Sequence, residues 1–160
     1  MQIALWSVAA LVVVAWAAPA DAQSRDATPR EIAAIRDCAA KNKDDLDAGE
    51  RRCLFKLVAD RCSGPPGRAK DSVLTDCFRI EGVIWDTLLN ENYKTLLGDL
   101  DDEQRDKARA MQRAWIADRE ATCGFYYDKI QGTMANMMIA ACSARETARR
   151  AMLLSFFSRL

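Results

Sequence analysis

A stripe of polar and aromatic side chains lies in the segment QRAWIADREATC, which begins at Gln112. Helical spacing places Gln112, Trp115 and Arg119 along one face of a helix. Tryptophan and arginine are favoured at the centres of protein interfaces, so an exposed stripe would be a binding surface. A buried stripe would be a scaffold, with its donors satisfied by neighbouring polar groups. We favour the scaffold, because this helix has few other large groups for a core face, and expect Asn90 and Tyr93 as its partners.

A short acidic segment is the second candidate site. Aspartate caps helices, and acids in a first turn complement the helix dipole, so local chemistry accounts for this pattern. The same carboxylates could instead contact a strongly basic protein, because complementary charge raises association rate and selectivity. The candidate partner-binding residues are Asp99, Asp101, Asp102 and Glu103.

The chain contains no histidine. This excludes Ser-His-Asp and Cys-His nucleophile systems, because both need an imidazole near neutral pH. Two close acids could hydrolyse a glycan, but Glu81 and Glu91 are ten positions apart on one expected helix. That spacing corresponds to roughly 15 Å, which is too far. We therefore predict no catalytic residue and a protein that is not an enzyme.

Six cysteines indicate disulfides in an exported chain. Zinc is the competing interpretation, but zinc ligands usually come in close Cys-x-x-Cys or histidine pairs. Here the nearest cysteines are nine positions apart. We expect three disulfides, no metal site and no cofactor. The cysteines are Cys38, Cys53, Cys62, Cys77, Cys123 and Cys142.

The disulfide pairing is only partly constrained by the sequence. A Cys123–Cys142 bridge would clamp two consecutive helices across the turn at Gly132. For the other four cysteines we favour Cys62–Cys77 and Cys38–Cys53. The alternative is Cys38–Cys77 with Cys53–Cys62, and sequence alone does not decide between them.

The first 22 residues resemble a cleaved secretory signal. Residues 3–18 carry no charge, and Ala20-Asp21-Ala22 fits an A-x-A cleavage site. A membrane span needs about 20 apolar residues, so we expect export to the periplasm or the medium, with no transmembrane segment in the mature chain. Residues 23–160 then suit one domain. The full chain has 23 basic and 23 acidic residues, which argues against a nucleic-acid partner.

The first half of the mature chain carries two expected helix starts and a loop. Thr28 can cap a helix, and Glu31 completes a capping box. A second start is expected at Asp47, in a helix whose apolar pattern continues as far as Val58. The sequence SGPPG at residues 63–67 predicts a loop.

The second half reads as three long helices. One is expected from Ser72 to a break at Gly98-Asp99. Asp101 and Gln104 predict a capping box for the next, which continues to about Lys129. A last helix is expected from near residue 134 to residue 157. Because no segment shows sustained period-two alternation, we predict an all-α, disulfide-stapled bundle of four to five helices.

A set of residues in the second half forms a pattern that resembles a known family. The set comprises Leu89, Asn90, Tyr93, Gln112, Trp115, Arg119, Cys123, Cys142, Thr147 and Arg150. It resembles the lysozyme inhibitor LprI N-terminal domain family, which consists of small exported bacterial proteins, over about residues 62–155. The resemblance implies a small α-helical, disulfide-bonded domain without established catalytic residues.

The sequence departs from this family in three ways. It has no lipidation cysteine, it adds an N-terminal extension at residues 23–61, and Glu120 stands where an aspartate often follows the arginine. From the resemblance we predict an exported protein-binding domain and candidate lysozyme inhibitor. The alternative is a periplasmic or envelope interaction module with a different partner. The sequence leaves the oligomeric state open.

Overall fold

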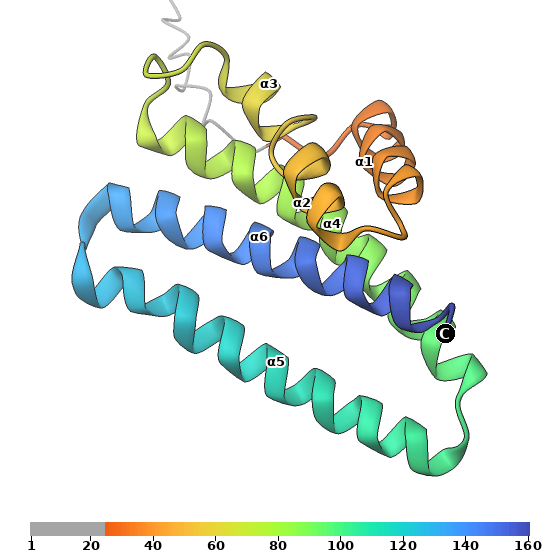
Figure 1. Cartoon of the computed structure of the whole chain (residues 1–160). Coiled ribbons are helices and arrows are strands. Elements are labelled where there is room, and N and C mark those ends of the chain that lie inside the picture. Colours follow the sequence, from red (N-terminus) through yellow and green to blue (C-terminus); the bar gives the residue numbers. More distant parts are fainter. Residues whose placement is uncertain (1–24) are drawn as a thin grey trace, which may run out of the picture.

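The structure is a computed structural model that describes residues 25–160 (Figure 1). The expected signal peptide, residues 1–22, lies outside the described residues. Residues 25–160 form α-helices joined by short loops and contain no strand, which confirms the all-α prediction. Its helices are α1 (Pro29–Lys41), α2 (Leu46–Cys53), α3 (Ala59–Ser63), α4 (Asp71–Asp99), α5 (Asp102–Lys129) and α6 (Gly132–Phe157).

The prediction of four to five helices is wrong, because residues 25–160 form six. The apolar run after Cys53 was expected to continue the second helix, but the chain turns there and starts the short α3. Phe55 adopts a left-handed conformation with φ of 66°, which helical backbone does not permit. The amide N–H groups of Phe55 and Ala59 both donate to the buried carboxylate of Glu81, at 2.6 and 2.9 Å. This carboxylate provides partners for backbone groups that helical hydrogen bonds leave free.

Two predicted capping boxes are confirmed. Thr28 and Glu31 exchange side-chain and backbone hydrogen bonds at the start of α1, and Asp101 and Gln104 do so at the start of α5. The expected start at Asp47 is wrong by two residues. Asp45 caps α2 instead, because its Oδ1 accepts from the Ala48 N–H at 2.8 Å.

The last helix also begins earlier than expected, at Gly132 and not near residue 134. Gln131 and Gly132 both have positive φ, at 61° and 67°, and together they reverse the chain between α5 and α6. Glycine adopts this conformation without a steric cost, which explains its place at the turn.

Helix α6 lies between α4 and α5, and α1 to α3 cover the α4 side of this layer (Figure 1). The core forms where α4 and α6 meet the N-terminal helices. Its largest fully buried side chains are those of Trp85, Ile35, Ile84 and Leu154. Each contributes about 1.5–3 kcal/mol by leaving water. The N-terminal extension is therefore part of the core, because Ile35 belongs to α1.

Helix α5 is attached to the bundle by few apolar contacts. Among its 28 residues only Ala108, Gln112 and Cys123 are buried. It packs along α6 and has few contacts with α4. Helices α4 and α5 therefore lie on opposite sides of α6.

Three disulfides fasten the helices. Cys38–Cys53 joins α1 to α2, Cys62–Cys77 joins α3 to α4, and Cys123–Cys142 joins α5 to α6. This is the pairing that the sequence favoured over its alternative. The bridges span 15, 15 and 19 residues. By chain-entropy estimates each contributes roughly 3 kcal/mol to the free energy of unfolding.

Candidate functional site

A polar seam joins α5 to α6 along the stripe that the sequence singled out. The Nε of Arg150 donates to the Oε1 of Gln112 at 2.8 Å, and the Nη1 of Arg119 donates to the Oγ1 of Thr147 at 3.1 Å. The Trp115 ring contacts both guanidinium groups, whose central carbons lie 4.7 Å (Arg119) and 5.6 Å (Arg150) from its centroid. These five residues form one connected cluster, called the seam below.

The sequence predicted that Asn90 and Tyr93 would form hydrogen bonds with the stripe, and this prediction is wrong. Asn90 is exposed and donates to Asp86 one turn away at 3.0 Å, and Tyr93 packs against the core. The reason is the order of the helices: α6 stands between α5 and α4, so the stripe of α5 meets Thr147 and Arg150 first. Leu89, from the same motif, is a buried core residue.

Arg150 is a buried cation without a matching anion. Its side chain is 7% exposed, and its Nη2 has no hydrogen-bond partner within the described residues. Burial lowers the pKa of Arg150 below its usual range, and Tyr93 opposes that shift. Because no carboxylate of residues 25–160 pairs with Arg150, the positive charge of the seam is not balanced. Burying a guanidinium without a carboxylate costs free energy.

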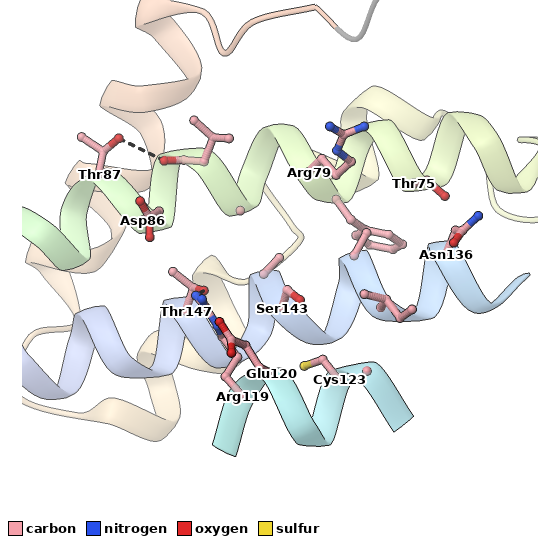
Figure 2. A pocket seen from close by; sticks show the side chains of 17 residues that line it. Thr75, Arg79, Asp86, Thr87, Arg119, Glu120, Cys123, Asn136, Ser143 and Thr147 are labelled. Carbon is pink, nitrogen blue, oxygen red and sulfur yellow. Dashed lines mark hydrogen bonds between the residues drawn. The ribbon is translucent and has the colours of Figure 1, made fainter. Parts of the chain in front are cut away.

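A groove opens between α4 and α5, with α6 as its floor (Figure 2). Its volume is about 860 Å³, within the range of small-ligand and peptide sites. The floor is made of short side chains, including Ala140, Ser143 and Ala144. Phe78 and Val83 contribute apolar walls from α4, and Val83 is 61% exposed.

Charged side chains of both signs line the groove. Arg79 and Asp86 come from α4, and Arg119 and Glu120 come from α5 (Figure 2). Arg79 lies 3.8 Å from Asp76, and Asp86 accepts from Asn90. Arg119 forms no salt bridge with a carboxylate of residues 25–160, and its bond to Thr147 occupies one of five N–H donors. The seam thus presents a positioned, half-buried guanidinium to the groove.

The acidic segment forms a corner at the α4–α5 connection. Asp99 ends α4, Asp101 caps α5, and Asp102 and Glu103 lie in its first turn. This acidic corner lies at one end of the molecule, beyond the last turn of α6 (Figure 1). Its four carboxylates are exposed, and Asp102 is 99% exposed at its side chain.

Two carboxylates of the corner form ion pairs within α5. Asp102 pairs with Arg105 at 2.8 Å, and Glu103 pairs with Lys107 at 2.6 Å. Such exposed pairs on one helix contribute about 0.3–0.5 kcal/mol, so a partner can displace them at small cost. The corner therefore serves both interpretations of the sequence, helix capping and an anionic contact surface.

Glu81 is the structural site that the sequence missed. Besides the two amides near α3, it accepts from the Nε1 of Trp85 at 3.2 Å, and it is fully buried. Burial raises the pKa of Glu81 above its ordinary value. The available signal was its place beside Ile80 and Ile84 on an apolar face, where a carboxylate needs partners. Glu91, by contrast, is exposed and pairs with Arg36 at 2.6 Å.

Within residues 25–160, no three cysteine, aspartate or glutamate side chains gather closely enough to hold a metal ion. None of the helices described there has an apolar stretch long enough to cross a membrane. The groove and the acidic corner are two features of this surface that suit ligand contact.

Fold and surface together define a disulfide-stapled helical domain with features suited to recognition. Residues 62–154, more than half of the chain, match the family model described as lysozyme inhibitor LprI. The chain therefore belongs to the LprI lysozyme inhibitor family, which confirms the resemblance seen in the sequence. Searches of curated proteins and of solved structures gave no match. The matched region holds α4, α5, nearly all of α6, the groove and the acidic corner, and it excludes α1 and α2.

Proposed function

We propose that this protein is an exported inhibitor that binds a lysozyme by protein–protein contact and catalyses no reaction. Membership of the LprI family carries the proposal. The three disulfides are consistent with a protein that works outside the cytosol, where such bonds persist. We further propose that the predicted signal peptide, residues 1–22, directs this export and that residues 23–160 act as one domain.

The acidic corner is the surface we assign to the lysozyme. Asp99, Asp101, Asp102 and Glu103 are exposed at one end of the bundle, where a larger partner can reach them without meeting α6 (Figure 1). A basic partner approaching this end is attracted by the summed charge, which raises the association rate at low salt. Rigid support comes from the capping box of Asp101 and Gln104 beneath the corner.

Affinity for lysozyme, measured by calorimetry over a series of salt concentrations, tests this assignment. The oxidised mature protein is compared with the triple variant Asp101→Asn, Asp102→Asn and Glu103→Gln. Asparagine still caps a helix, so the fold of α5 is retained. At roughly 0.5 kcal/mol for each rim charge, we expect about tenfold weaker binding and a shallower salt dependence.

A second triple variant serves as the matched control. Asp37→Asn, Asp118→Asn and Asp128→Asn remove the same charge from exposed positions away from the corner. This control should bind lysozyme nearly as the wild type does. Equal weakening by both triples would show that only net charge matters and would contradict the role of the corner. No binding of the wild-type protein to any lysozyme type would reject the proposed function.

A further inference from the structure

We propose that the groove between α4, α5 and α6 binds a short extended peptide segment of a partner protein, and that Arg119 receives a carboxylate of that segment. This site is separate from the acidic corner and does not depend on lysozyme as the partner. The positive charge of the seam, the shape of the groove and the polarity of its walls each support it.

The charge of the seam favours an anion at this position. Arg119 and Arg150 both contact the Trp115 ring, and neither forms a salt bridge with a carboxylate of the residues that the structure describes. Arg119 is held in place by the Trp115 ring and by its hydrogen bond to Thr147, and Figure 2 shows Arg119 and Thr147 close together at one end of the groove. A guanidinium fixed in this way loses little freedom on binding, and its remaining donors match the two oxygens of a carboxylate.

The shape of the groove suits an extended chain. Along α6 the lining runs from Asn136 to Thr147, which corresponds to about 16 Å at the helical rise. An extended chain covers that length with about five residues. A peptide backbone can come close to α6 here, because the half-buried side chains of Ala140 and Ser143 are short.

The walls supply contacts for both parts of a peptide. Exposed Val83 and half-buried Phe78 and Ile139 offer apolar surface to side chains. Ser143 and Asn136, on the α6 floor, offer hydrogen-bonding groups to a peptide backbone (Figure 2). The expected ligand is therefore a segment with apolar side chains and one aspartate, glutamate or C-terminal carboxylate near the Arg119 end.

A random pentapeptide library, displayed and selected on the immobilised oxidised protein, tests the proposal without lysozyme. We expect the bound sequences to be enriched in acidic residues flanked by apolar ones. Arg119→Gln should abolish the acidic enrichment, whereas Arg113→Gln, an exposed position on the same helix, should keep it. No acidic enrichment on the wild type, or the same enrichment on Arg119→Gln, would overturn the proposal.

A double-mutant cycle separates direct contact from a structural role of Arg119. The most enriched peptide and its version with glutamine in place of the acid are titrated against wild type and Arg119→Gln, with thermal unfolding confirming that both fold. The carboxylate should raise affinity about tenfold or more on the wild type and hardly at all on the variant. Equal effects on both proteins would contradict the contact. Acetate binding as tightly as the peptide would reveal a simple anion site and would also overturn the peptide proposal.

Discussion

Arg119 on α5 and Thr147 on α6 are joined by a hydrogen bond of 3.1 Å, and the Trp115 ring stacks against the same guanidinium. This contact holds the middle of a helix that has few buried residues of its own. It also orients Arg119 on the wall of the groove. One polar contact thus links the stability of the bundle to the shape of a binding surface.

Replacing Thr147 should therefore weaken the attachment of α5. Thr147→Val keeps the volume of this buried side chain but removes the acceptor of Arg119. We expect the free energy of unfolding to fall by about 1 kcal/mol, the net contribution of one hydrogen bond. The loss stays this small because water can partly solvate the half-buried guanidinium. Urea unfolding measures this, with Thr95→Val at an exposed position of α4 as the control. Equal stability of both variants would contradict the role given to this bond.

The buried carboxylate of Glu81 should give an unusual pH dependence. Its pKa lies above the ordinary value of 4.5 because burial outweighs its three N–H donors. The folded state then holds the proton more tightly than the unfolded state, so this contribution to stability is fully present below pH 4.5 and declines as pH rises through the folded pKa. The stability advantage of wild type over Glu81→Gln should shrink between pH 4 and pH 7.

Glu91 on the same helix provides a comparison of opposite sign. The bidentate hydrogen bond from Arg36 lowers the pKa of Glu91. Its contribution is present above the unfolded pKa and is lost as pH falls, so the advantage of wild type over Glu91→Gln should grow from pH 4 to pH 7. Unfolding midpoints at several pH values decide this, and the same trend for both variants would contradict the assignment for Glu81.

The Cys123–Cys142 bridge should determine the local stability of α5. Replacing both cysteines by alanine removes a cross-link worth roughly 3 kcal/mol. Since only three residues of α5 are buried, we expect its amide protons to lose more protection from exchange than those of α4. The matched control replaces Cys38 and Cys53, which should leave α5 protected. Unchanged exchange in α5 after loss of its own bridge would contradict this prediction.

Local chemistry made much of this fold predictable. Thr28 and Asp101 mark the starts of α1 and α5, because each forms a capping box with a residue three positions later in the chain. The spacing of Gln112, Trp115 and Arg119 likewise predicted one shared face. Contacts of this kind depend on neighbours in sequence, which the sequence displays directly.

Contacts between distant segments were harder to predict. Helical spacing shows that Arg119 and Gln112 share a face, but it does not show which helix that face meets, and so Thr147 and Arg150 were missed as partners. The break after Cys53 depends on Glu81, which is 26 residues away from Phe55. Such features follow from the packing of helices that are remote in the chain.

The rate of bacterial cell-wall lysis by lysozyme, measured with and without the oxidised mature protein, tests the central claim most directly. At near-equimolar ratio we predict clear slowing of lysis, and weaker slowing by the variant with Asp101, Asp102 and Glu103 neutralised. An unchanged rate with every lysozyme type tested, from a sample shown to contain all three disulfides, would contradict the account.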